Sequence, residues 1–130
     1  MSQPTFHLSL SVSDLEQTRR FYEQQLGARV GRATEHWIDL WLFGAQVTVY
    51  ARPDAVMPLP YRQAQHFGAT LDWAAWQALA DRLTATATVF QLDPTVWTDK
   101  GQAKMVLADP DGYLVEIKAY RDESILGRPS

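Results

Sequence analysis

The sequence of 130 residues contains no cysteine, and this absence excludes several kinds of chemistry. Without thiols there is no disulfide framework, no thiolate metal site and no cysteine nucleophile. Any metal ion must therefore be held by histidine, carboxylate or amide groups. Only three histidines are available, His7, His36 and His66, so the candidates for an imidazole ligand are few.

Long apolar runs and clustered positive charge are also missing. No apolar run approaches the roughly 20 residues that cross a membrane, and the first residues lack the charged and then apolar pattern of a signal region. The net charge is −3 and Lys and Arg do not cluster, which is not the electrostatic pattern of nucleic-acid binding. We therefore expect a cytoplasmic protein that binds neither membranes nor nucleic acids.

The chain does have ample material for a core, because 46% of its residues are hydrophobic and it holds five each of Trp, Tyr and Phe. Its length predicts one globular domain over residues 1–130. Within it the order of patterns occurs twice. We assign repeat one to 5–52, a proline-rich linker without regular structure to 53–63, repeat two to 64–120 and a tail to 121–130.

Repeat one opens with a strictly alternating strand that places His7 and two serines opposite an apolar face. A helix follows, which Ser13 or Asp14 can cap and which Gly27 ends. Gly44 predicts a tight reversal between the last two strands. The predicted elements are strands 6–12, 28–33, 37–43 and 46–51 and a helix over 15–26.

Repeat two follows the same order, with Asp72 as the cap of its helix and Asp109–Gly112 as a tight turn between its last two strands. We expect 93–102 to be a loop. The sequence therefore predicts an α+β fold of two βαβββ repeats, a recurrence that is the strongest global signal in the chain. The eight strands are expected to form a curved mixed sheet around a cleft, with one helix outside each half.

One charge stands in the most apolar strand of the chain. Glu116 needs a partner there, because an unpaired buried charge is costly, and the partner is either a protein cation or a metal ion. When the repeats are superposed, His7 lies on His66 and Thr48 lies on Glu116. Two histidines and one glutamate have the composition of the facial triad that suits Fe(II), Mn(II), Ni(II) or Zn(II).

Several segments carry a resemblance to a known family. They are the strand with His7, the helix end Phe21–Gly27, the strand start His66–Gly68 and the turn and strand Asp109–Ile117. Together they resemble the vicinal-oxygen-chelate superfamily, which includes glyoxalases, bleomycin-resistance proteins, fosfomycin-resistance thiol transferases and extradiol dioxygenases. With Trp37–Asp39 added, the sequence is most similar to a branch described as predicted extradiol-dioxygenase-like.

The resemblance implies that His7, His66 and Glu116 hold the metal, with Fe(II) or Mn(II) favoured and Zn(II) or Ni(II) as further choices. Metal-binding glyoxalases of this superfamily commonly add a fourth ligand, and here that position is Thr48, a poor ligand. The resemblance also implies a homodimer, and some dimers of this kind exchange modules so that one histidine ligand comes from the partner.

The leading function is therefore that of an oxidoreductase, which uses a divalent metal to cleave the ring of a small substrate with vicinal oxygens. One alternative is a lyase of the glyoxalase or thiol-transferase type. Another is a metal-free protein that binds a drug or another flat small molecule, as bleomycin-resistance proteins do.

Alternation places Gln46, Thr48 and Tyr50 on one face of their strand. The resemblance implies that the third strand of each repeat also lines the pocket, which would bring Trp37, Asp39 and Trp41 or Lys104 and Val106 toward the metal. Tyr50 and Lys104 are candidates for catalytic roles, although Lys104 also fits a solvated cation. Asp39 is a candidate hydrogen-bond partner for a ligand histidine. Trp37 and Trp41 either offer a surface on which a substrate stacks or belong to the core. The predicted substrate pocket comprises Trp37, Asp39, Trp41, Gln46, Thr48 and Val106.

Overall fold

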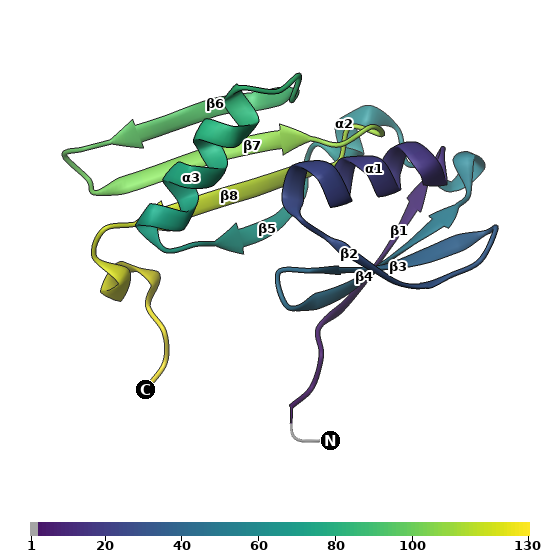
Figure 1. The fold of residues 1–130 in the computed structure, drawn as a ribbon, viewed down its shortest axis with the longest axis horizontal. Coiled ribbons are helices and arrows are strands. Elements are labelled where there is room, and N and C mark those ends of the chain that lie inside the picture. The colour runs from purple at the N-terminus through teal and green to yellow at the C-terminus, as the bar shows by residue number, and fades with distance from the viewer. Residues whose placement is uncertain (1–2) are drawn as a thin grey trace. The chain divides into compact units, whose positions relative to one another are not determined.

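A computed structural model describes residues 3–130, which form two compact units. The first unit runs up to Arg62 and includes the turn Asp109–Gly112, and the second contains Gln63–Ala108 and Tyr113–Ser130. Each unit has the βαβββ order, so the predicted α+β class and the internal repeat are confirmed (Figure 1). The eight strands are divided between two mixed sheets of four strands each.

The first unit is built on sheet A, whose strands lie in the order β1-β4-β3-β2. β1 is parallel to β4, and the other pairs are antiparallel. Phe43 and Gly44 both have positive φ, 52° and 76°, as a two-residue hairpin between β3 and β4 requires. The predicted reversal at Gly44 is confirmed. The elements are β1 (His7–Val12), α1 (Leu15–Leu26), β2 (Arg29–Ala33), β3 (Trp37–Leu42) and β4 (Ala45–Ala51).

Helix α1 covers one face of sheet A and leaves the other face open. The Asp14 carboxylate accepts a hydrogen bond from the Gln17 amide at the start of α1, and Gly27 ends the helix with φ 72°. Since strand side chains alternate, Leu40 and its neighbours point toward α1 and every second residue points away. The buried residues on the helix side include Tyr22, Leu26, Ile38, Leu40, Leu42, Val47 and Val49.

The second unit is built on sheet B, with the order β5-β8-β7-β6. Figure 1 shows α3 lying over the strands of this sheet, and its Trp76 indole donates a buried hydrogen bond of 2.9 Å to the Ile117 carbonyl. Asp72 caps α3, as the sequence predicts. The elements are β5 (His66–Thr70), α3 (Trp73–Thr84), β6 (Phe90–Trp97), β7 (Gln102–Ala108) and β8 (Leu114–Tyr120).

Two predicted irregular segments are regular instead. The prediction of a loop over 93–102 is wrong, because β6 continues to Trp97 and only a short turn follows before β7. Pro94 is compatible with this strand because β6 is a sheet edge, where a missing amide donor leaves no partner unsatisfied. The linker expected over 53–63 contains two short helices, since proline is tolerated in the first turn of a helix. They are a 3-10 helix, Pro53–Ala55, and α2, Leu59–Arg62.

The turn Asp109–Gly112 is held by side chains of the first unit. The Tyr22 hydroxyl donates a buried hydrogen bond of 2.7 Å to Asp109, and the Ser13 hydroxyl donates one of 2.6 Å to Asp111. The Arg62 guanidinium donates to the Asp111 carbonyl. The predicted tight turn is confirmed by a 2.8 Å bond from the Gly112 amide to the Asp109 carbonyl. These bonds explain why the turn belongs to the first unit.

The tail after β8 forms one short 3-10 helix, Glu123–Leu126. Among residues 3–130, no helix combines the length and the apolar character that crossing a membrane requires.

Candidate functional site

The open face of sheet A gathers most of the predicted pocket. Strand registers place His7 beside Gln46 and Gln46 beside Trp41, and the next row along the strands holds Thr48 and Asp39. Tyr50 and Trp37 form the third row. Trp37 is half-buried and Trp41 is 43% exposed, so neither belongs to the buried core. The sequence-predicted residues of the first unit therefore share one face with His7.

Asp39 is the buried charge of this face. Its side chain is 1% exposed, and its two carboxylate oxygens accept hydrogen bonds from the Thr48 hydroxyl and the Arg32 Nε, each at 2.7 Å. The sequence indicated Asp39 as the partner of a ligand histidine, whereas its hydrogen bonds go to Thr48 and Arg32. Burial opposes ionisation of Asp39, but these two hydrogen bonds outweigh it and keep the pKa of the carboxyl below its usual value.

This lowered pKa predicts a dependence of stability on pH. Because the pKa of Asp39 is lower in the folded than in the unfolded chain, where it is about 3.9, the ionised group stabilises the fold above that value. The contribution is lost as the pH falls through the folded-state pKa. We expect Asp39→Asn to lower the free energy of unfolding by about 1–3 kcal/mol at pH 7 and by less at pH 3.

Urea unfolding of the wild type and Asp39→Asn between pH 7 and pH 3 measures this difference. Asp81→Asn, which removes an exposed carboxylate from α3, is the control and should change little. A difference between wild type and Asp39→Asn that stays constant over this range would contradict the prediction.

The open face of sheet B carries Glu116 with two partners. Its side chain is 16% exposed; Oε2 lies 3.5 Å from the His66 Nε2 and Oε1 lies 3.4 Å from the Lys104 Nζ. The predicted need for a partner at Glu116 is thus met within the unit by a histidine and a cation. Val106, directly opposite Glu116 in the register, is buried.

A cavity of about 240 Å³ lies over this group. Lys118 faces Lys104 directly across β8 and β7, and two like charges at this spacing repel each other. The two lysines together carry more positive charge than the single carboxylate of Glu116 compensates. The lining residues are His66, Gly68, Ala69, Thr70, Glu116 and Lys118.

The two sheets place the predicted ligands at equivalent positions. Ser9 pairs with Thr48 across β1 and β4, and Gly68 pairs with Glu116 across β5 and β8. Thr48 and Glu116 are therefore equivalent. His7 and His66 each stand two residues earlier on the first strand of their units.

Histidine and carboxylate groups suit a divalent metal, and each unit holds only part of the predicted ligand set. His66 and Glu116 offer one imidazole and one carboxylate close together, which are two of the three ligands of a facial triad. His7, the third, belongs to the other unit. Within residues 3–130 no group of three His, Asp or Glu side chains gathers closely enough to hold an ion.

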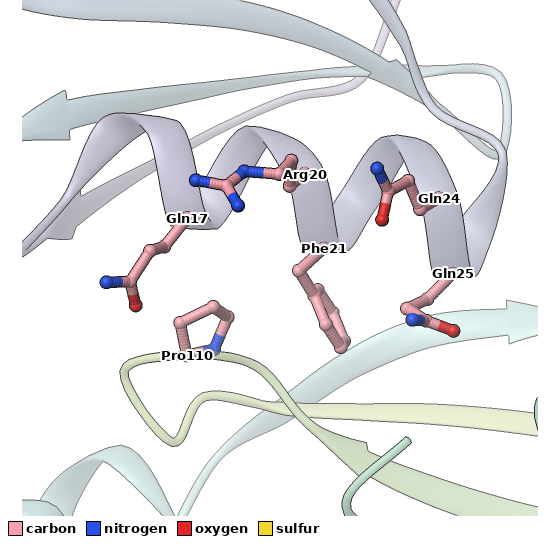
Figure 2. A pocket seen from close by; sticks show the side chains of 6 residues that line it. All are labelled: Gln17, Arg20, Phe21, Gln24, Gln25 and Pro110. Atoms are coloured by element: carbon pink, nitrogen blue, oxygen red, sulfur yellow. The ribbon is translucent and has the colours of Figure 1, made fainter. Parts of the chain in front are cut away.

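A separate hollow of about 300 Å³ lies between α1 and Pro110. Figure 2 shows Gln17 and Phe21 extending from α1 on the side of Pro110. Arg20 is the one charged residue among those that line it, so this hollow lacks the acid–base and ligand groups of the two open faces. The other lining residues are Gln24 and Gln25.

Three residues of the open faces were not predicted from the sequence as site residues. Arg32 was not predicted because regular alternation places its side chain on the helix side of β2. Gly68 and Lys118 carried weak signals, since a glycine inside a strand indicates a close backbone approach and Lys118 follows Glu116 by two residues. Both belong to the lining of the sheet B cavity.

Residues 5–117 match the glyoxalase/bleomycin resistance protein/dioxygenase superfamily. The chain belongs to this superfamily. The match spans both units, and it agrees with the repeated βαβββ order. No curated protein matches the sequence significantly.

Solved structures of the superfamily are similar over nearly the whole chain. A glyoxalase/bleomycin resistance protein/dioxygenase from Alicyclobacillus acidocaldarius is 24% identical, with 97% of this chain and 99% of that one covered and a TM-score of 0.78. Fosfomycin resistance protein FosX from Listeria monocytogenes is 17% identical, with 95% and 98% covered and a TM-score of 0.74. The oxidase ChaP-H2 is 18% identical, with 92% and 94% covered and a TM-score of 0.69. At these identities the likeness shows the fold alone.

Proposed function

We propose that the protein is a divalent-metal-dependent enzyme that acts on a small substrate with two adjacent oxygen atoms, and that His7, His66 and Glu116 hold the metal. The observation that supports this most is the pair formed by His66 and Glu116 on the open face of sheet B. The exposed imidazole of His7 stands at the equivalent of His66 on sheet A. The name of the superfamily covers both enzymes and resistance proteins. The choice between an enzyme and a binding protein therefore depends on whether these three residues bind a metal.

The bound ion would supply Lewis-acid chemistry or the activation of oxygen, with Fe(II) or Mn(II) favoured and Zn(II) or Ni(II) as alternatives. With three protein ligands, the ion would keep open coordination positions for both substrate oxygens. Ring cleavage of a catechol-like compound is the leading reaction, ahead of a lyase reaction of the glyoxalase or thiol-transferase type. Thr48 is hydrogen-bonded to Asp39 instead of presenting a carboxylate, which disfavours a fourth protein ligand.

The side chains around the ligands have separate tasks in this proposal. Lys104 lies against Glu116 and offers a cation to a substrate anion or a developing negative charge. Tyr50 is a candidate for proton transfer on the open face of sheet A. His36 has no such role, because it is exposed and lies 3.3 Å from the neighbouring Glu35.

A second candidate function is metal-free binding of a flat small molecule. The ion pair between Lys104 and Glu116 favours it, because this pair neutralises the carboxylate without a metal. Trp37 and Trp41 offer partly exposed aromatic surfaces for such a ligand.

Metal content distinguishes the two functions. We expect the wild type, purified without oxygen, to contain close to one divalent ion per chain by mass spectrometry. His7→Ala, His66→Ala and Glu116→Ala should each lower the affinity by more than about 100-fold, because removal of a direct ligand costs more than removal of its outer partners. His36→Ala is the matched control and should keep the ion. A folded wild type that takes up none of Fe, Mn, Ni or Zn would exclude the enzyme and leave the binding protein.

The same variants test the proposed homodimer with exchanged modules. If His7 of one chain completes the site of another, mixing His7→Ala with Glu116→Ala should restore metal to about one quarter of the sites. Half of the randomly formed dimers are then mixed, and one of the two sites in each is intact. If His7 and Glu116 act within one chain, every site in the mixture lacks a ligand and no metal returns.

A further inference from the structure

The Arg32 side chain is hydrogen-bonded to the open face of sheet A through its Nε, and most of its surface is exposed to solvent. Its Nε donates to Asp39 at 2.7 Å, and its side chain is 75% exposed while that of Asp39 is 1% exposed. Within residues 3–130, Nη1 and Nη2 have no hydrogen-bond partner. Four N–H donors are therefore available to a ligand, on a guanidinium group that the buried carboxylate holds.

A β-bulge places Arg32 on this face. The pairing of β2 with β3 shifts between Val30 and Ala33, so that Gly31 and Arg32 together occupy the position opposite Asp39. In a regular strand Arg32 would lie on the same side as Val30, which pairs with Leu40. Bulges commonly redirect a side chain in this way and are frequent beside functional sites.

Gly31, the first residue of the bulge, leaves space for the indole ring of Trp41. A Cβ at Gly31 would lie 2.7 Å from the Trp41 Nε1, so a side chain at this position would displace the indole. The bulge thus brings Arg32 onto the open face and keeps Trp41 on it.

Two aromatic rings restrain two guanidinium groups on this face. The Arg32 guanidinium carbon lies 5.2 Å from the centre of the Trp37 ring, and that of Arg52 lies 4.3 Å from the centre of the Tyr50 ring. Trp37 and Tyr50 are paired in the register of β3 and β4. These cation–π contacts restrain the guanidinium groups, which lowers the entropy lost when a ligand binds. The Asp39 charge is already compensated, so the charge that remains exposed is positive.

We propose that Arg32 binds the oxyanion of an aromatic substrate, a carboxylate or a phosphonate, through Nη1 and Nη2, with the ring of the substrate against Trp37. Planar guanidinium groups bind two oxygens of such groups at once, and lysine does not. Arg32 would then determine substrate specificity, a role that rests on the proposed function, whereas the oxyanion site itself needs no metal. Arg32 stands on β2, three strand spacings of about 4.8 Å from β1, and it lies in the row of Thr48, which is not the row of His7. A substrate that reaches both residues must therefore carry its anion and its vicinal oxygens at opposite ends.

Titration of metal-free protein with benzoate, phenylphosphonate and the neutral benzamide tests the oxyanion site. Binding is followed by the NMR signal of the Trp37 indole N–H, which the variant Trp37→Phe assigns. We expect the wild type to bind at least one of the two anions about tenfold or more tightly than benzamide. The preferred anion identifies the oxyanion as a carboxylate or a phosphonate. Arg32→Gln should remove the preference, and Arg20→Gln, which removes an exposed charge from α1, should keep it.

Two further variants keep the test decisive. Arg32→Lys retains a positive charge for Asp39, so its fold should persist while its preference for the anions weakens. His7→Ala should bind the anions as the wild type does, which separates this site from the proposed metal. Equal affinities for the anions and benzamide, or an unchanged preference in both Arg32 variants, would overturn the proposal.

Discussion

Replacing Gly68 with alanine is expected to lower the free energy of unfolding by more than about 3 kcal/mol. A Cβ at this position would lie 1.7 Å from the Glu116 carbonyl oxygen and 2.7 Å from its carbonyl carbon. These are backbone atoms of the neighbouring strand, so no side chain can rotate away. β5 and β8 must separate, and parallel strands that separate lose hydrogen bonds as well as packing.

The effect should reach the candidate site. His66 stands on β5 and Glu116 on β8, so a shift between the two strands changes the 3.5 Å distance between their side chains. Chemical denaturation measures the stability of Gly68→Ala, and metal uptake measures the state of the pair. We expect both to be impaired, because one displacement causes both losses.

Gly31→Ala is the matched control. Its Cβ would also approach another atom too closely, at 2.7 Å, but that atom is the Nε1 of a Trp41 side chain that is 43% exposed and able to move. The loss should stay within about 1 kcal/mol. If Gly68→Ala is as stable as Gly31→Ala, the close approach of β5 and β8 does not govern this unit.

The sequence predicts the fold well because the signals for it are local and repeated. The alternation around His7 and around His66, the caps Asp14 and Asp72 and the turn at Asp109 each depend on a few neighbouring residues. Their recurrence in the same order indicates two equivalent units. The prediction failed at 93–102, where β6 continues through Pro94 because it is an edge strand.

The candidate site is predicted less completely because it depends on pairings between strands. Alternation identifies which residues share a face with Glu116 but not that Lys104 and His66 both reach its carboxylate. Arg32 is the clearest case. Only the register shift against β3 turns it toward Asp39, and a bulge of this kind leaves no reliable mark in a single sequence.

Lys104→Met is expected to separate metal binding from structural charge pairing at Glu116. In the metal-free protein the substitution leaves the largely buried carboxylate with His66 alone, so we expect a loss of about 1–2 kcal/mol in the free energy of unfolding. If Glu116 is a metal ligand, an ion must displace Lys104 from Oε1 in the wild type. Without Lys104 this competition disappears, and the affinity for Mn(II) should rise about tenfold, which corresponds to about 1.4 kcal/mol.

Thermal unfolding with and without Mn(II) measures both effects, because an ion that binds only the folded chain stabilises it by an amount that grows with the logarithm of its affinity. The stabilisation by Mn(II) should be greater in Lys104→Met than in the wild type. Lys118→Met is the control, since Lys118 faces Lys104 across the strands but forms no ion pair with Glu116 among the described residues. A Lys104→Met protein that is destabilised and gains nothing from Mn(II) would assign Lys104 and Glu116 to a structural ion pair. The metal-free binding protein would then be the better account of this chain.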